Sequence, residues 1–186
     1  MAGWTAFTLD GVARRAGVGK AALYRRWPTK EHLLAEALQE HARPRTPSDT
    51  GGLRGDARAL AVALLDHFLA PAGLVTLRVA VDASTGRESF VSHHRRLVRD
   101  HHDAVSVLVR RAVERGELAA GTDPRPFGAA LYGSVLMHAM AMGPRQREHA
   151  REHVEEHALP LADFVLASLT GGPPRPDAQP SGRSQR

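Results

Sequence analysis

The amino-acid sequence predicts an all-α protein with a short basic head and a longer helical body. Of its 186 residues, 42% are hydrophobic but only 5% are aromatic, a balance that favours helices because strands draw on aromatic and β-branched side chains. Apolar residues recur at helical spacing between breaks that contain Gly or Pro. The net charge of +5 lies at the amino end: residues 1–30 hold six bases and one acid, whereas the rest of the chain holds 19 of each.

A basic head on a neutral body is typical of a polyanion-binding module, and a solvated basic surface is the plainer interpretation. The chain has no cysteine, which excludes a disulfide framework and thiolate metal ligands. Its start lacks the basic and apolar segments of a signal peptide, and no apolar run has the length of a membrane span. We therefore expect a cytoplasmic protein with no membrane partner.

The head reads as three helices. Thr8 is placed to cap a helix over residues 9–16, and Gly17 ends it. A second short helix over 19–26 follows, and a third begins at Lys30. Two short helices around a glycine turn, followed by a capped third, form a helix-turn-helix outline.

The body reads as five further helices. We expect them over residues 56–69, 73–83, 88–115, 124–142 and 146–169. The resulting domain boundaries are 1–42 for the head, 43–55 for a linker or mobile loop, 56–170 for the body and 171–186 for a disordered tail rich in Pro, Gly and Ser.

The second helix has the composition of a groove-entering helix. Ala16, Val18 and Leu23 are expected to face a small core. Residues expected to point outward toward base edges are Lys20, Ala21, Ala22 and Arg25, where the alanines allow close approach and the bases donate to guanine. Residues expected to hold phosphates are Thr8, Tyr24, Arg26 and Lys30.

The segment FTLDGVARRAGVGKAALYRRWPTKEHLLAEAL, residues 7–38, closely resembles the DNA-binding signature of TetR-family transcriptional regulators. Residues 115–143, which begin RGEL and continue to TDPRPF, resemble the segment that leads into the penultimate helix of the family. The resemblance implies a homodimer on a palindromic double-stranded DNA operator, acting as a repressor that a small apolar or amphipathic effector releases. It also implies phosphate contacts at Thr8, Tyr24 and Lys30 and a recognition face at Lys20, Ala21, Ala22, Arg25 and Arg26.

The sequence departs from the family pattern at three places. Gly19 stands where many members have serine, and Arg26 stands where histidine is frequent. Only seven residues precede Thr8, where family members carry a full first helix. We expect either a true start codon upstream or a truncated form. In the second case the alternative function is a helical small-molecule-binding dimer without competent DNA binding.

The body is expected to hold the effector and the dimer interface. The candidate pocket residues are Phe68, Leu77, Leu108, Tyr132, Leu136, Met137, His138 and Met140, although methionines at helical spacing are also ordinary core residues. The last two helices are expected to pair with those of a second chain, because Gly128, Ala129, Gly133 and Ser134 permit close approach.

No metal, other cofactor or enzymatic activity is expected. His149, His153 and His157 are spaced four residues apart, but the glutamates between them favour a solvated charged face over a metal site. The pairs His93-His94 and His101-His102 diverge on a helix. The sequence contains no G-x-S-x-G motif, no phosphate-binding glycine loop and no H-E-x-x-H motif.

Overall fold

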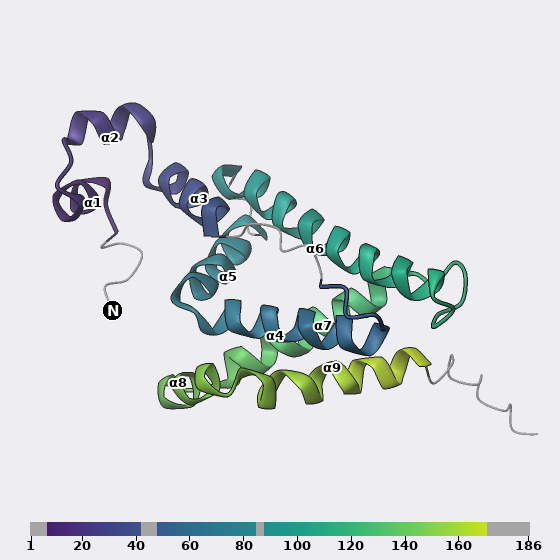
Figure 1. Ribbon diagram of the computed structural model, residues 1–186. Helices are drawn as coiled ribbons and strands as arrows, with labels where there is room; N and C mark the ends of the chain where they lie inside the picture. Colours follow the sequence, from purple (N-terminus) through teal and green to yellow (C-terminus); the bar gives the residue numbers. More distant parts are fainter. Residues whose placement is uncertain (1–6, 42–47, 85–87, 171–186) are drawn as a thin grey trace, which may run out of the picture.

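The computed structural model describes residues 7–41, 48–84 and 88–170 (Figure 1). Within these ranges it contains nine helices and no strand, which confirms the all-α prediction. The helices are α1 (Leu9–Ala16), α2 (Lys20–Arg26), α3 (Lys30–His41), α4 (Leu53–Leu69), α5 (Pro71–Ser84), α6 (Glu88–Glu114), α7 (Pro124–Ala141), α8 (Pro144–Glu152) and α9 (Val154–Thr170).

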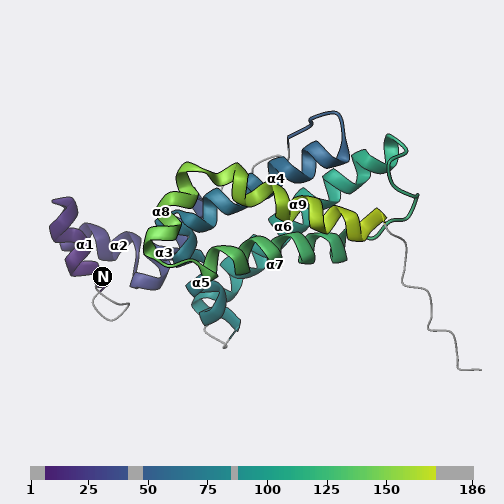
Figure 2. The ribbon, with the colours of Figure 1, turned by 90° about the horizontal axis from the view of Figure 1, so that it is seen from below.

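The body is built around α4, which packs against α9 and α7, while α6 packs against α7 and α5 (Figures 1 and 2). Ala57 and Ala61 of α4 face Ala158 and Ala162 of α9 in one core, and all four are fully buried. Small side chains at these positions let the two helix axes approach closely. This core is the structural centre of the molecule.

An 87° bend joins α4 to α5. A Cβ atom on Gly73 would lie 2.1 Å from the carbonyl oxygen of His67, so the bend requires glycine at this position. In the described ranges no single helix is long and apolar enough to cross a membrane, and only this bent pair reaches that length and composition. The core-facing side of α4 is buried in the body.

The head has its own small core, formed by Leu9, Ala13 and Leu23. It projects from the body on α3, as the two ribbon views show (Figures 1 and 2). Leu34 of α3 packs against a separate cluster that includes Phe90, and α3 contacts α5 and α6 there. The head therefore meets the body through α3, on the side formed by α5 and α6.

The start of α4 differs from the prediction by three residues. Helix α4 begins at Leu53 rather than at residue 56, because the backbone N–H of Leu53 donates to Glu117 and the Asp56 carboxylate accepts from Thr50. Residue 42 of the predicted head, residues 43–47 of the predicted linker and the predicted tail at 171–186 lie outside the described residues.

The single helix predicted over 146–169 is two helices, and the break falls at His153, where φ is −125° and ψ is 41°. Hydrogen bonds from Arg147 account for the direction of α8, which differs from that of α9. Its guanidinium donates to the carbonyl oxygens of Phe68 (2.5 Å) and Ala139 (2.7 Å), near the carboxyl ends of α4 and α7. Helix α8 is thereby held across both helix ends, a tertiary contact that the sequence pattern does not contain.

Candidate DNA-binding interface and body cavity

The turn between α1 and α2 forms through local hydrogen bonds. The Thr8 hydroxyl accepts from the backbone N–H of Gly11 at 3.1 Å and caps α1. Gly17 ends α1 with a φ of 67°, in the left-handed region that favours glycine. The predicted cap and stop are both present.

The prediction of the head core is partly wrong. Leu23 is buried against α1, but Ala16 and Val18 are exposed. Val18 lies in the turn rather than on a helix, so its side chain is not carried toward the core by helical periodicity. The apolar side chains packed against the head core are Val12, Trp27 and Leu33.

Helix α2 presents nearly its whole surface to solvent. The exposed residues are Lys20, Ala21, Ala22, Tyr24, Arg25 and Arg26, and Leu23 is the buried one. At about 100° per residue, Ala21 and Arg25 lie opposite Leu23. Thr8 is also exposed, whereas Lys30, at the start of α3, is half-buried. The predicted DNA-facing residues therefore surround one outward ridge with Ala21 and Arg25 at its centre.

One flank of this ridge is positioned by Asp10 of α1. Its carboxylate pairs with Lys20 Nζ at 2.6 Å and accepts from the Tyr24 hydroxyl at 3.3 Å. The hydrogen bond from Lys20 holds the pKa of Asp10 below its ordinary value. Asp10 thus orients two side chains that the sequence analysis assigns to DNA.

The other flank is positioned by Glu36 of α3. Arg26 and the indole N–H of Trp27 each donate to its carboxylate at 2.7 Å, and the Arg26 guanidinium lies 4.8 Å from the Trp27 ring centroid. These hydrogen bonds, that of Arg26 first, lower the pKa of Glu36. Among the described residues Arg25 forms no ion pair, so its guanidinium remains available at the centre of the ridge.

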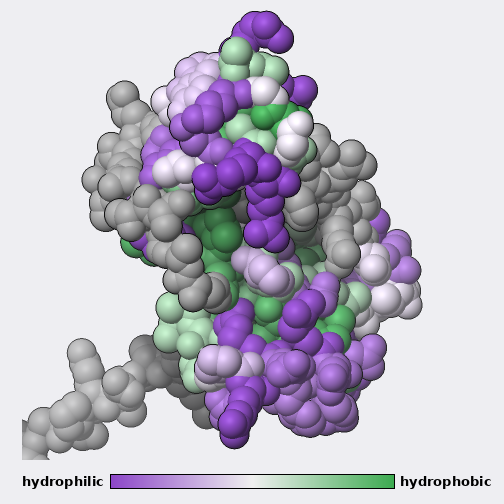
Figure 3. All heavy atoms as spheres, turned by 90° about the vertical axis from the view of Figure 1, so that its left-hand side faces the viewer, coloured by the Kyte–Doolittle hydropathy of each residue, from purple (hydrophilic) through white to green (hydrophobic). Residues whose placement is uncertain are grey.

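Sequence reasoning missed the positioning roles of Asp10 and Glu36. Asp10 carries a local signal only for the helix dipole, and Glu36 lies ten residues from its partner Arg26. Neither contact follows from helical periodicity. Figure 3 looks onto this end of the molecule, where hydrophilic side chains cover much of the upper part and hydrophobic surface lies in the hollow below it.

The body contains a cavity of about 210 Å³ between α6 and α7. Its lining includes Tyr132 and His101, which hydrogen-bond to each other. Burial lowers the pKa of His101 to about 4, with smaller contributions from His67 and His102, and burial raises the pKa of Tyr132. At neutral pH the cavity wall therefore presents a neutral imidazole and a neutral phenol.

Some of the predicted pocket residues are buried or half-buried in the body, and others are exposed or pair with α9. The ring of Phe68 packs edge-on against that of Tyr132 at 5.6 Å, Leu108 is buried, and Leu77 and Leu136 are half-buried. Met137 and Met140 are instead 63% and 51% exposed, and His138 pairs with His157 on α9. His101, which lines the cavity, was not among the predicted pocket residues.

Two family models match the chain. The model described as bacterial regulatory proteins, tetR family, matches residues 2–37, and the model described as tetracyclin repressor-like, C-terminal domain, matches residues 47–157. The two matches meet close to the boundary between α3 and α4.

Curated relatives agree with these matches. The HTH-type transcriptional regulator AqdR of Rhodococcus erythropolis is 32% identical over 71% of this chain, and the alignment covers 64% of AqdR, just under two thirds of its length. The uncharacterized HTH-type transcriptional regulator Rv1556 of Mycobacterium tuberculosis is 30% identical over 90% of this chain and 80% of its own.

A solved structure shares the fold. The transcriptional regulator FadR from Bacillus subtilis, in complex with stearoyl-CoA, superposes with a TM-score of 0.64 at 12% sequence identity, over 92% of this chain and 91% of FadR. Both the helix-turn-helix head and the helical body are thus covered by models of one family of transcriptional regulators. The chain belongs to the TetR family of bacterial transcriptional regulators.

Proposed function

We propose that this chain is a repressor that binds a palindromic operator as a homodimer and leaves it when a small effector occupies the body. The observation that carries the proposal is the outward ridge of α2, with Ala21 and Arg25 at its centre and cations on both flanks. A ridge with small residues beside a free guanidinium suits the major groove, where Arg donates to guanine.

The two kinds of contact are divided between the residues of the ridge. Arg25 and Lys20 read base edges, and Tyr24, Lys30 and Thr8 hold phosphates. Phosphate contacts contribute affinity to every sequence and release counterions, whereas base contacts discriminate between sequences. Substitutions of the base-reading residues and of the phosphate-holding residues are therefore expected to change DNA binding in different ways.

The test measures binding of the purified protein to labelled DNA from its own upstream region and to random duplex DNA, at several salt concentrations. Arg25→Ala should cost about 1–3 kcal/mol on specific DNA and little on random DNA. Lys30→Ala should weaken both and reduce the salt slope by about 1. Arg78→Ala, an exposed arginine of α5, is the matched control. Equal effects of Arg25→Ala on both DNAs would contradict the division. Absence of binding to either DNA would favour the small-molecule-binding dimer.

We place the dimer interface on α7 and α9. Met137 and Met140 of α7 and Phe164 of α9 are large apolar side chains with 63%, 51% and 75% exposure, and apolar residues so exposed are typical of a covered interface. A second copy of this chain is the partner that the family implies. Phe164→Glu should shift the protein toward monomer in sedimentation experiments, whereas Val81→Glu, at an exposed site on α5, should not.

The effector is proposed to enter between α6 and α7. The cavity of about 210 Å³ is smaller than the roughly 300–1,000 Å³ of drug-sized sites, so a compact apolar or amphipathic molecule suits it. A hydrogen-bonding group on that molecule would find the pair formed by His101 and Tyr132. FadR, which shares the fold, was solved with stearoyl-CoA, and a long acyl chain would require this cavity to open.

Helix α6 offers a route from this cavity to the head. His101 lies on the cavity wall, and Phe90, eleven residues earlier on α6, packs with Leu34 of α3. At 1.5 Å per residue the two sites are about 16 Å apart along one helix. A shift of α6 would change the separation of the two α2 helices from the roughly 34–36 Å that successive major grooves require. An effector that binds without altering operator affinity would refute this coupling.

A further inference from the structure

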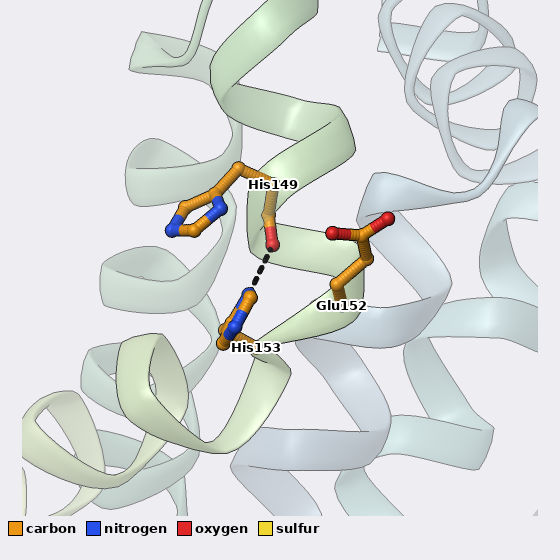
Figure 4. A group of neighbouring side chains, drawn as sticks. All are labelled: His149, Glu152 and His153. Carbon is orange, nitrogen blue, oxygen red and sulfur yellow. Dashed lines mark hydrogen bonds between the residues drawn. The ribbon is translucent and has the colours of Figure 1, made fainter.

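Three potential metal ligands gather where α8 ends and α9 begins. His149 and Glu152 belong to the last turns of α8, and His153 is the residue at which the helix breaks. One ligand atom from each of them lies within 4.8 Å of the others. Figure 4 shows the three side chains around this turn, with His153 directed at the carbonyl oxygen of His149. We propose that they bind a borderline first-row divalent ion such as Zn²⁺, a site independent of the proposed function.

The hydrogen bond of His153 prepares a ligand nitrogen. Its Nδ1 lies 3.1 Å from the backbone carbonyl oxygen of His149. Because a carbonyl oxygen can only accept, Nδ1 carries the proton and Nε2 keeps its lone pair. Histidines that bind metals usually donate their second ring nitrogen to a backbone carbonyl or carboxylate, which fixes the ring and its tautomer. His153 has this arrangement.

The spacing of the histidines suits one ion. Their ring centroids lie 4.3 Å apart, and two histidines four residues apart on a helix can share a metal. Donor atoms of a tetrahedral zinc site stand roughly 3.3 Å from one another, given Zn–N bonds of about 2.0–2.1 Å. The ligand atoms of the three residues lie within 4.8 Å of one another, and His149 and Glu152 are exposed whereas His153 is half-buried. The proposed site requires rotation of the two exposed side chains toward His153.

Glu152 supplies the third donor. Within the described ranges its carboxylate makes no ion pair, unlike those of Glu36 and Glu117. Two imidazole nitrogens and one carboxylate oxygen, completed by water, form a donor set suited to Zn²⁺, Ni²⁺ or Cu²⁺ rather than to Mg²⁺ or Ca²⁺. The spacing His-x-x-Glu-His also occurs in one class of zinc peptidases, but we propose binding of the ion alone.

The three potential ligands differ from the three evenly spaced histidines considered from the sequence. The sequence places His157 in line with His149 and His153, but the structure pairs His157 with His138 at 3.2 Å. The rings of His149 and His157 lie 6.4 Å apart. Glu152, assigned to a solvated charged face, takes the third position. Because the helix breaks at His153, the three neighbouring ligands include Glu152 in place of His157.

The first experiment titrates Zn²⁺ into tag-free, metal-free protein by calorimetry, and Co²⁺ by visible absorption. We expect one ion per chain. His149→Ala and His153→Ala should each weaken binding at least about tenfold, and Glu152→Gln should weaken it less. His102→Ala, at an exposed histidine of α6, should bind as the unaltered protein does.

Folding is controlled by circular dichroism and by the melting temperature of the metal-free variants, which should match that of the unaltered protein. Zn²⁺ should raise the melting temperature of the unaltered protein and of His102→Ala but not that of His149→Ala. The proposal is overturned if neither ion binds. It is also overturned if only His138→Ala and His157→Ala abolish binding, or if one ion is shared by two chains.

Discussion

The head and the body are stabilised in different ways. Among the described residues, the head buries three apolar side chains in its core, whereas the main cluster of the body buries twenty. The head ion pairs of Lys20 with Asp10 and of Arg26 with Glu36 are exposed, whereas the body contains a fully buried carboxylate, Asp56. Exposed pairs contribute little stability, and buried charges cost much when a partner is lost. The ion pairs of the head therefore serve mainly to position side chains, and those of the body hold the fold.

The buried carboxylate of Asp56 illustrates how charged groups hold the body together. It accepts hydrogen bonds from the backbone N–H and hydroxyl of Thr50, both at 2.7 Å, and from the Arg115 guanidinium at 3.1 Å. Arg115 also pairs with Glu117, which accepts from the backbone N–H of Leu53. The network ties the start of α4 to the end of α6. Burial acts to raise the pKa of Asp56, but the bonds from Thr50 and Arg115 outweigh it, so the pKa is lowered.

The largest effect is expected for Asp56→Asn. The amide removes a buried charge acceptor and should cost about 3 kcal/mol of unfolding free energy at pH 7. Because the folded pKa lies below the ordinary 3.8, the carboxylate contribution is complete above that pH and is lost as pH falls through the folded pKa. Urea unfolding at pH 7 and in acid measures both. Asp49→Asn, an exposed member of the same network, should have a much smaller effect, and an equal effect would show that burial of Asp56 does not account for its contribution.

His101 provides a second test of the body. Its pKa of about 4 in place of 6.5 means that the unfolded chain binds more protons between these values. The contribution of neutral His101 to the free energy of unfolding is therefore fully present above pH 6.5. The free energy of unfolding should fall by about 3 kcal/mol as pH drops to 4. His101→Gln should flatten the profile of unfolding free energy in this window. The neighbouring exposed His102→Gln removes only a smaller contribution to this pKa shift and should change the slope far less. A slope unchanged in His101→Gln would show that burial does not govern this side chain.

Local signals explain which features could be predicted. Thr8, Gly17 and Asp123 act on backbone groups within four residues, and the bounds of α1 and the start of α7 are as expected. The pair formed by Tyr132 and His101 spans 31 residues of sequence, and Arg147 reaches the carbonyl of Phe68 across 79. Such contacts depend on how helices cross, which periodicity does not encode. The positioning roles of Asp10 and Glu36 were missed for the same reason.

The junction between head and body gives an intermediate effect. Leu34 is half-buried against the cluster of Val79, Ala83 and Phe90, so Leu34→Ala should cost about 1–2 kcal/mol, below the range for a fully buried leucine. Hydrogen exchange should accelerate in α1 to α3 while α4 and α9 remain protected, since the main body core is untouched. Leu74→Ala, at an exposed leucine of α5, is the control. Uniform acceleration in all helices would mean that head and body unfold as one unit.

The smallest change in stability is expected for Asp10→Asn in the head. The Asp10 side chain is 48% exposed and its ion pair with Lys20 lies at the surface, so its loss should leave the melting temperature unchanged within error. DNA binding should nevertheless respond. Without the carboxylate, Lys20 and Tyr24 lose a common partner and the ridge gains positive charge, so affinity for random DNA should rise with a steeper salt dependence while discrimination between sequences falls. Asp103→Asn, an equal charge change on an exposed site of α6, separates net charge from position. If both variants bind random DNA alike and keep their sequence preference, Asp10 contributes charge alone and the head pairs do not position the recognition ridge.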